Sequence, residues 1–379
     1  MYYDGTISEF IQIDFGVVDV EEVFVKVNGE YKSLKTMTIP YTNDNINTTK
    51  LANLNIKHDV IILEEGIKKI YMTNNAEKVY LPKSLEKVDK FSGDVEELYF
   101  AGDLEQFLNL FVFSGGTWGK MGRVNRFFMM GENGEYQEVK ELVIPASCTV
   151  VNDDFVYFKG IESIVIPKTM EHVMTPILND DTALKRVYFN GTILDWCKIT
   201  FTSSNANPMS VASEFYLLDD NNEYCLLEEL VIPNGVTKIG DYQFYNFKQI
   251  KSIIWNDVLR VIGKEAFFSL TQITEVLLPN SLQELENKAF NECSNLKKLY
   301  LPNGITELSG SAFVNNDNLR VLITEFSFEE LENRGLYLSN EIGLYFVDGN
   351  KVYVRHQKLV DDIIWEYKDQ KLQIIKVAK

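Results

Sequence analysis

The residue types best suited to catalysis or metal binding are few in this chain and widely spaced. His58, His172 and His356 are its three histidines, and they form neither an HExxH motif nor a helical pair, the arrangements that bind hydrolytic zinc. The four cysteines lack a CxxC spacing, so they do not suggest a zinc site. They are Cys148, Cys197, Cys225 and Cys293. We expect buried free thiols, although an even count leaves extracellular disulfides open.

Carboxylates are abundant, with 55 acidic residues, and several gather with asparagine in runs at 152–154, 179–181, 219–220 and 315–317. Hard oxygens of this kind bind calcium, but none of the runs has EF-hand spacing. Asn and Asp also favour turns by bonding their own backbone, so we expect solvated turns. No acid pair stands out for glycoside hydrolysis, and GxSxG and P-loop motifs are missing from the sequence. We expect no catalytic residues, no metal and no cofactor, and an enzyme built on the loops is the least favoured class.

The net charge and the hydropathy pattern indicate which classes of partner are disfavoured. A formal net charge of −18 repels phosphate backbones and anionic lipid, so we expect no nucleic-acid partner. No run approaches the roughly 18 apolar residues needed to span a bilayer, and the first residues, MYYDGTISEF, lack the pattern of a signal peptide. We therefore expect no membrane insertion.

A repeat with a fixed period organises the carboxyl-terminal half. Its anchor positions, which follow one another at intervals of 23 residues, are Pro233, Asn256, Pro279, Pro302 and Glu325. Apolar residues recur three, six, eleven and seventeen positions after each anchor, and the eleventh position is phenylalanine in four consecutive repeats: Phe244, Phe267, Phe290 and Phe313. A period of this length lies within the leucine-rich-repeat range. These columns are core positions.

The end of each repeat alternates with period two, which is typical of a strand. The inward pairs are Ile253/Trp255, Val276/Leu278 and Leu299/Leu301. Proline at the anchor has no N–H to donate and therefore suits the end of a strand. We expect one strand per repeat, with all strands joined in a continuous parallel sheet and short helices or turns on the opposite side.

Three longer units interrupt the array, at about 5–35, 102–140 and 191–228. They begin with DGTISEFIQIDF, AGDLEQFLNLFVF and NGTILDWCKITF and contain NGEY, NGEY and NNEY, which align Tyr31, Tyr136 and Tyr224. Apolar residues two, five and eight positions after the first glycine suit one face of a short helix. The second motif is typical of a hairpin turn. We expect a helix and a β-hairpin in each insert.

The segment LLPNSLQELENKAFNECSNLKKLYLP resembles the leucine-rich repeat of the bacterial surface protein A family, also called the Treponema pallidum type. The resemblance covers roughly residues 40–325. It implies an α/β leucine-rich-repeat solenoid and an adhesive or host-interaction role.

The array is predicted to fill residues 1–335, and residues 336–379 to form a β-rich cap with a hairpin around Asp348-Gly349. No amino-terminal cap is visible, which favours a chain cut from a longer precursor over an end covered by another molecule. Oligomeric state is open between a monomer and end-to-end self-association.

The candidate binding surface is the outward-facing strand position between the two inward ones. This column holds Tyr80, Tyr99, Tyr188, Ile254, Leu277 and Tyr300, and Trp118 in a glycine-rich insert loop is a further candidate anchor. Such residues also suit any exposed sheet face. A long apolar stripe bearing tyrosine is nevertheless typical of an interaction surface.

Two functional classes follow. The leading hypothesis is a non-catalytic module of the bacterial surface, or a secreted one, that binds a protein or glycan. The alternative is a structural or scaffolding solenoid within a larger protein or a cytoplasmic assembly.

Overall fold

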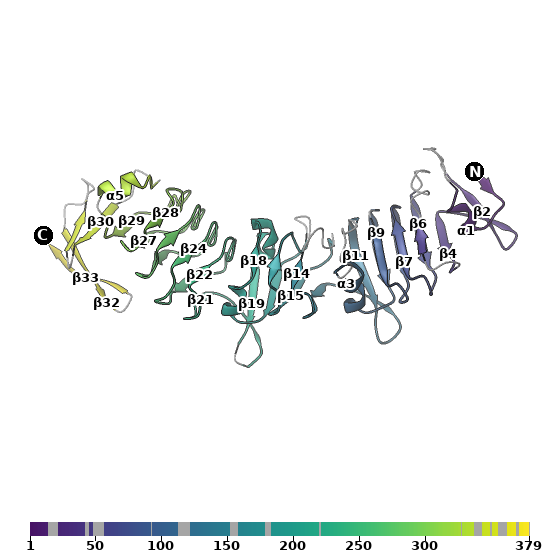
Figure 1. The fold of residues 1–379 in the computed structure, drawn as a ribbon, viewed down its shortest axis with the longest axis horizontal. Coiled ribbons are helices and arrows are strands. Elements are labelled where there is room, and N and C mark those ends of the chain that lie inside the picture. Colours follow the sequence, from purple (N-terminus) through teal and green to yellow (C-terminus); the bar gives the residue numbers. More distant parts are fainter. Residues whose placement is uncertain are drawn as a thin grey trace. The chain divides into compact units, whose positions relative to one another are not determined.

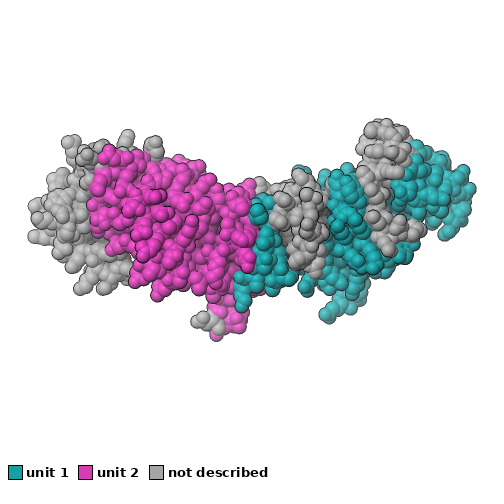
Figure 2. Space-filling view, in the orientation of Figure 1, with its two compact units in different colours: residues 1–169, 174–185 teal, residues 170–173, 186–379 magenta. Residues whose placement is uncertain are grey.

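The computed structural model describes most of the chain. The described residues are 1–13, 22–41, 45–47, 57–91, 93–112, 122–151, 158–178, 183–219, 221–326, 328–336, 343–348, 351–354, 362–368 and 371–378. They divide into two compact units, shown in Figure 2: unit 1 is residues 1–169 with 174–185, and unit 2 is residues 170–173 with 186–379. The predicted boundary between an array and a cap at residue 336 stays a prediction.

Unit 1 consists mainly of parallel strands in successive repeats (Figure 1). One sheet has the order β12-β11-β10-β8-β6-β4, a second has β5-β7-β9 and a third has β1-β2-β3. In chain order the elements are β1 (Tyr2–Tyr3), α1 (Ile7–Phe10), β2 (Phe24–Val27), β3 (Glu30–Ser33), β4 (Thr36–Ile39), β5 (Asn45–Asn47), β6 (His58–Leu63), β7 (Lys69–Met72), β8 (Ala76–Leu81), β9 (Lys87–Phe91), β10 (Val95–Phe100), α3 (Leu104–Val112), β11 (Val124–Met130), β12 (Tyr136–Glu138), β13 (Glu141–Val143), β14 (Val150–Val151) and β15 (Ser163–Pro167).

Unit 2 holds the regular 23-residue repeats. The elements up to the first of these repeats are β16 (His172–Val173), β17 (Arg186–Asn190), α4 (Ile193–Trp196), β18 (Thr200–Phe201), η1 (Ser204–Ala206), η2 (Pro208–Ser210), β19 (Glu214–Leu218), β20 (Tyr224–Leu226) and β21 (Glu229–Val231). The rest are β22 (Lys238–Ile239), β23 (Ser252–Ile254), β24 (Val261–Ile262), β25 (Glu275–Leu277), β26 (Glu284–Leu285), β27 (Lys298–Leu301), β28 (Glu307–Leu308), β29 (Val321–Thr324), α5 (Phe328–Asn333), β30 (Gly343–Asp348), β31 (Lys351–Val354), β32 (Asp362–Lys368) and β33 (Lys371–Ala378).

Each regular repeat supplies two strands, so the expectation of one strand per repeat is wrong. The first strand alternates inward and outward side chains, as predicted. The second is only two residues long, and these short strands form a ladder of their own, β22-β24-β26-β28. Their inward residues are the apolar column six positions after each anchor, at Ile239, Ile262, Leu285 and Leu308. Strands this short give almost no alternation for a sequence pattern to detect.

The phenylalanine column forms the core on the side opposite the longer strands. Successive rings stack at centroid distances of 5.4 Å between Phe244 and Phe267, 5.0 Å between Phe267 and Phe290, and 5.7 Å to Phe313. The segments that carry them are turns rather than helices. They bond from one repeat to the next, with the amide of Phe267 donating to the carbonyl of Ala289 at 2.8 Å. Repeats therefore depend on their neighbours for both packing and backbone pairing.

The inserts contain the predicted short helices and hairpins. Helices α1, α3 and α4 follow the aligned glycines, and α1 and α4 begin with a capping box. Thr192 accepts a hydrogen bond from the Asp195 amide at 3.2 Å and donates its own amide to the Asp195 carboxylate at 3.1 Å. Trp196 of α4 is completely buried and donates its indole N–H to the Gln243 carbonyl at 2.9 Å. Each helix thus joins the core of its unit.

The three hairpins pair β2 with β3, β11 with β12 and β19 with β20, all antiparallel. Their turns need a residue with positive φ, which is Gly29 (φ 86°) in the first, Gly134 (φ 76°) in the second and Asn222 (φ 61°) in the third. Glycine and asparagine are the residues that adopt this conformation most easily. The predicted hairpin near residue 348 is also present, as β30 with β31.

The expectation of one continuous parallel sheet is wrong, because the strands form several sheets. Three interruptions have the same cause. Strands β2, β11 and β19 each pair on one side with their own hairpin strand, so the next repeat strand, β4, β13 or β21, starts or joins a different sheet. A fourth interruption lies between β23 and β25 and has no hairpin.

Candidate functional site

Most predicted surface residues lie on the strand face expected for them. Tyr80 of β8 and Tyr99 of β10 are half-buried neighbours in the sheet of unit 1, and their rings stack 4.3 Å apart with an angle of 8° between planes. Tyr188 of β17 is half-buried in unit 2. Trp118 lies outside the described residues.

Tyr300 differs from the expectation, because it is only 4% exposed. It lies in β27 between Leu277 of β25 and Ile323 of β29, and Ile323 is buried as well. Its hydroxyl donates to Glu325 Oε1 at 2.9 Å and lies 3.3 Å from Asn280 Oδ1. Strand alternation gives the face of a side chain but not what covers that face, so the prediction of an exposed Tyr300 is wrong.

The stack formed by Tyr80 and Tyr99 continues onto the insert. Phe128 of β11 stacks on Tyr99 at 4.6 Å. Tyr136, from the hairpin strand β12, packs edge-on against Tyr99 at 5.1 Å and against Tyr80 at 5.9 Å. We call these four rings the second aromatic cluster. Edge-to-face and offset-stacked arrangements are the favourable geometries for aromatic pairs, so the rings hold one another in place.

The other two inserts build the same arrangement. In the first aromatic cluster Tyr2 stacks on Phe24 at 4.8 Å and Tyr31 packs edge-on against Tyr2 at 5.1 Å. In the third, Tyr188 stacks on Tyr216 at 5.0 Å and Tyr224 packs against Tyr188 at 4.7 Å. In every case the last ring comes from the hairpin strand. Tyr2, Tyr31 and Tyr224 are 68%, 42% and 37% exposed.

Sequence reasoning missed most of these rings. It aligned the hairpin tyrosines Tyr31, Tyr136 and Tyr224 but read the motif around them only as a turn. The signal that was available is the register of the hairpin: an aromatic residue on the insert strand lies beside the tyrosine of the preceding repeat strand. Without a known register, side chains on two strands cannot be assigned to one cluster.

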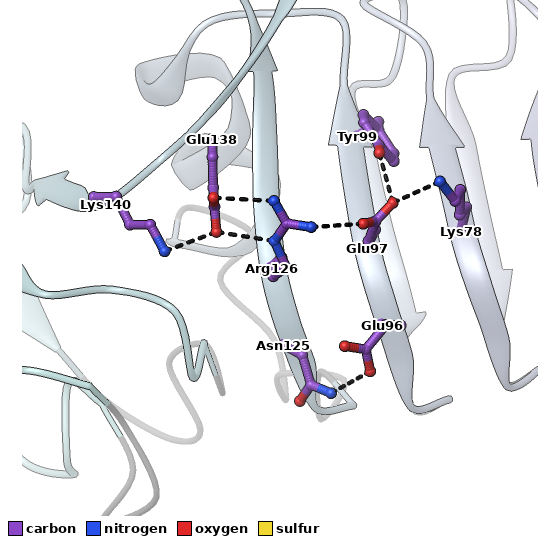
Figure 3. Close-up of polar contacts among 8 residues, drawn as sticks. All are labelled: Lys78, Glu96, Glu97, Tyr99, Asn125, Arg126, Glu138 and Lys140. Atoms are coloured by element: carbon purple, nitrogen blue, oxygen red, sulfur yellow. Dashed lines mark hydrogen bonds and ion pairs between the residues drawn. The ribbon is translucent and has the colours of Figure 1, made fainter.

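A row of alternating charges borders the second aromatic cluster, as Figure 3 shows. Lys78, Glu97 and Arg126 lie on adjacent strands, where Glu97 receives the Lys78 ammonium group at 2.9 Å and the Arg126 guanidinium at 2.8 Å. Arg126 also forms two hydrogen bonds with Glu138 of β12, at 3.1 and 3.2 Å, and Lys140 pairs with Glu138 at 2.8 Å. Below this row, Asn125 donates to Glu96.

The charge row is joined to the aromatic rings. The Tyr99 hydroxyl donates to Glu97 Oε2 at 2.7 Å, and the Arg126 guanidinium lies 4.8 Å from the centre of the Phe128 ring. The hydrogen bond from Tyr99, with that from Lys78, holds the pKa of Glu97 below its usual value. Burial and the bond to Glu97 raise the pKa of Tyr99 well above its usual range. Near neutral pH the carboxylate is therefore ionised and the phenol is neutral.

The remaining two candidates line a surface hollow in unit 2. Ile254, which is 43% exposed, and the half-buried Leu277 face a hollow of 670 Å³ at the interruption between β23 and β25. Its rim carries Lys251, Asp257 and Glu275.

The described residues show how the histidines, cysteines and carboxylates are placed. They contain no group of three or more histidine, cysteine, aspartate or glutamate side chains placed to hold a metal ion. The four cysteines are free; Cys148 and Cys293 are buried as expected, Cys197 is half-buried, and Cys225 is exposed. Asp219, in one of the acidic runs, accepts the amides of Asn221 and Glu223 at 2.8 and 2.9 Å, as a turn residue does.

No described helix has the length and apolar character needed to cross a bilayer.

Comparison with known proteins identifies the repeat. Residues 219–342 match the model of the BspA type leucine rich repeat region in six copies. No curated protein sequence matches the chain.

Several solved structures are similar. One is a leucine-rich repeat protein from Bacteroides ovatus, with 13% identity, 89% of this chain and 100% of that chain covered, and a TM-score of 0.40. A leucine rich cell surface protein from Faecalibacterium prausnitzii has 13% identity over 86% of this chain and 98% of that one, with a TM-score of 0.35. The pneumococcal vaccine antigen PcpA has 16% identity over 83% and 74%, with a TM-score of 0.35.

Proposed function

We propose that this chain, which carries BspA-type leucine-rich repeats, is a non-catalytic binding module that engages a protein or glycan through its three aromatic clusters. The observation that supports the proposal is repetition: three inserts of different sequence each place a hairpin tyrosine against a stacked aromatic pair. The packing of a hydrophobic core does not require aromatic side chains to recur at half-exposed positions of all three inserts. Aromatic side chains are the residues most enriched at binding hot spots.

The chemistry of the clusters suits recognition. Tyrosine offers a large apolar ring and a hydroxyl at a low cost in conformational entropy. The partner would meet rings that are already fixed by their neighbours, together with a row of ordered charges in the second cluster. Preorganisation of this kind lowers the entropy lost on binding.

The proposed location is the bacterial cell surface or the secreted fraction. The BspA-type repeat region supports this assignment, because that family is named for a bacterial surface protein. The net charge of −18 supports a partner other than nucleic acid. Stacked repeats forming one continuous solenoid belong to the same proposal.

The test is binding of the purified chain to an array of glycans and extracellular-matrix proteins. A variant with Tyr80, Tyr99 and Tyr188 changed to serine removes one or two rings from two clusters. A matched variant changes Tyr242 and Tyr245 to serine, since these are half-buried tyrosines on turns outside the clusters. We expect the first variant to lose binding at least tenfold and the second to keep it. Equal binding by all three chains would overturn the proposal, and no binding by the unaltered chain would favour a scaffolding role.

A further inference from the structure

The third aromatic cluster adjoins an arginine that has no partner among the described residues. Arg186 lies two positions before Tyr188 in β17, so both side chains project from the same face of the strand. The Arg186 guanidinium forms no hydrogen bond or ion pair with another described residue, and its Nε atom is buried. Buried polar groups are nearly always hydrogen-bonded, so an unbonded guanidinium nitrogen calls for an explanation.

In the second aromatic cluster the corresponding charges are paired. Glu97 and Arg126 occupy opposite positions on the neighbouring strands β10 and β11, and the guanidinium lies 2.8 Å from the carboxylate (Figure 3). Arg126 also donates two hydrogen bonds to Glu138, which comes from the hairpin strand β12. This guanidinium is therefore bonded to carboxylates of its own chain and is not available to bind an anion.

The third cluster has the same strand register with the two charges exchanged, but the ion pair is not formed. Arg186 of β17 lies opposite Glu214 of β19. The Glu214 carboxylate accepts the Tyr216 hydroxyl at 2.9 Å and has no ion pair with a described residue. One cation and one carboxylate oxygen thus stay available on neighbouring strands.

The hairpin strands of the two clusters differ at the position that matters for this pairing. In the second cluster β12 places Glu138 opposite Phe128, whereas in the third β20 places Leu226 opposite Tyr216. Leu226 is 37% exposed and cannot pair with a cation. The hairpin of the third cluster therefore supplies an apolar side chain where that of the second supplies a carboxylate.

Other groups of the third cluster are also free to contact a ligand. The Tyr188 hydroxyl has no hydrogen bond to another described residue. Tyr224 is 37% exposed, and its ring is held in place by packing against Tyr188 at 4.7 Å and by a hydrogen bond from its hydroxyl to Asn190. The cluster therefore offers a cation, a hydroxyl, a carboxylate acceptor and a fixed apolar ring.

These groups restrict the chemistry of the ligand. A guanidinium binds a carboxylate through two parallel hydrogen bonds. Glu214 and the net charge of −18 repel a ligand with several negative charges, so a single carboxylate is favoured. The Glu214 oxygens need a donor such as a hydroxyl, and the Tyr224 ring needs an apolar surface. A sugar that carries one carboxylate supplies all of these, since one face of its ring consists of C–H groups.

We propose that the third aromatic cluster binds a carboxylated sugar residue of a glycan, with the sugar carboxylate on Arg186. The sugar hydroxyls bond to Tyr188 and Glu214, and the apolar face of the ring packs against Tyr224. This inference rests on the function proposed above and names the ligand class of one of its clusters. The second cluster, in which the arginine is already paired, is expected to lack this preference.

The experiment measures binding of the full chain to matched pairs of oligosaccharides. The acidic members are sialyllactose and a disaccharide that ends in glucuronic acid, and in their partners the carboxylate is reduced to an alcohol. A further arm holds peptides with a single glutamate flanked by serine and tyrosine. We expect an acidic sugar to bind at least about tenfold more tightly than its reduced partner, because hydrogen bonds between charged groups are the strong ones. Equal binding within both pairs, or tighter binding of the peptides than of either acidic sugar, overturns the proposal.

Variants of the chain locate the binding. Arg186→Gln removes the cation, and Arg260→Gln is its control, because Arg260 is exposed and lies in another repeat, outside the three aromatic clusters. We expect R186Q to bind the acidic sugar about tenfold more weakly and the reduced sugar as before, and R260Q to bind both as the unaltered chain does. Arg186→Lys keeps the charge but not the two-pronged geometry, so it should also bind the acidic sugar more weakly, and it carries the test if R186Q does not fold. Binding of the acidic sugar by R186Q and R186K at the level of R260Q overturns the proposal.

The same measurements separate this inference from the proposed function. If acidic and reduced sugars bind alike, and both lose binding when Tyr80, Tyr99 and Tyr188 are changed to serine, the aromatic clusters remain the binding surface and only the role of Arg186 fails. If neither the sugars nor any member of the glycan and matrix-protein array binds the unaltered chain, both proposals fail.

Discussion

The ladder of repeat strands is interrupted after β11 and again after β23, and the two interruptions differ in whether a further strand covers the edge. At β11 the hairpin strand β12 covers the free edge, and its Tyr136 completes a ring cluster with Tyr80 and Tyr99. Residues 221–326 are all described, and within them no backbone hydrogen bond joins β23 to β25, beside which a surface hollow lies. An exposed strand edge is a ready template for another chain, so proteins normally cover it. At β11 the edge is covered by a hairpin, whereas β23 and β25 are held next to each other by the ladder of short strands β22-β24-β26.

Replacement of the tryptophan beside each kind of interruption should give the largest difference in the free energy of unfolding. Trp196, next to the hairpin-closed β19, is fully buried and hydrogen-bonded, so Trp196→Ala should lower the free energy of unfolding by about 3–5 kcal/mol. Trp255→Leu restores the side-chain type of the other repeats and should cost less, about 1–2 kcal/mol. Urea denaturation of both variants measures the difference. Equal losses would show that Trp255 is an ordinary core residue.

Hydrogen exchange of the free chain should detect the open edge itself. The amides of Trp255 and Thr274 should exchange at least about tenfold faster than those of Leu278 and Lys297, because a hydrogen bond contributes about 1 kcal/mol or more to protection. In Trp255→Leu the amide at position 255 should slow towards the rate of Leu278. Unchanged exchange in this variant would mean that the large Trp255 indole is not what keeps β23 and β25 from pairing.

A smaller effect is expected for the aromatic rings beside the hairpin strand β12. A double-mutant cycle of Tyr99→Ala and Tyr136→Ala should give a coupling of about 0.5–1.5 kcal/mol, since the two rings pack edge-on at 5.1 Å. The same cycle with Tyr99 and Tyr2 should give nearly none, because the Tyr2 ring packs against Phe24 and Tyr31 of the first aromatic cluster. A negligible coupling in the first cycle would mean that the hairpin ring does not hold the cluster.

The charge row should have the smallest effect, and it depends on pH. The pKa of Glu97 is lowered in the folded chain, so its contribution to stability is present above the unfolded value of about 4.3 and is lost as pH falls through the folded pKa. Glu97→Gln should therefore remove part of the stability difference between pH 7 and pH 3, by less than about 1 kcal/mol. Identical acid profiles of the two chains would exclude this contribution.

Much of the fold could be predicted from the sequence because the repeat makes each core column visible several times. The 23-residue spacing of Phe267, Phe290 and Phe313 leads directly to their stack, and the aligned glycines and NGEY motifs lead to the insert helices and hairpins. The second strand of each repeat was hidden because it has only two residues.

The candidate site was harder to predict from the sequence than the fold, for two physical reasons. Alternation of strand residues located Tyr80 and Tyr99 on one face of their sheet, but the register that brings Tyr136 against these two rings depends on a hairpin. Trp255 fits an apolar column in sequence, where other repeats have Ile232, Leu278 or Leu301, and the pattern does not tell that the strands beside it, β23 and β25, are unpaired. Hydrophobic pattern records burial and does not record whether two strands come close enough to pair.

The most direct measurement is hydrogen exchange of the full chain with and without a saturating partner taken from the array of glycans and matrix proteins. The account predicts that the hairpin amides of Val139 and Leu227, which donate to Phe127 and Phe215, slow markedly when the partner is bound, while the amides of Leu278 and Lys297 in the regular repeats exchange as before. Protection that leaves these hairpin amides unchanged, or that spreads equally over the whole chain, would contradict it.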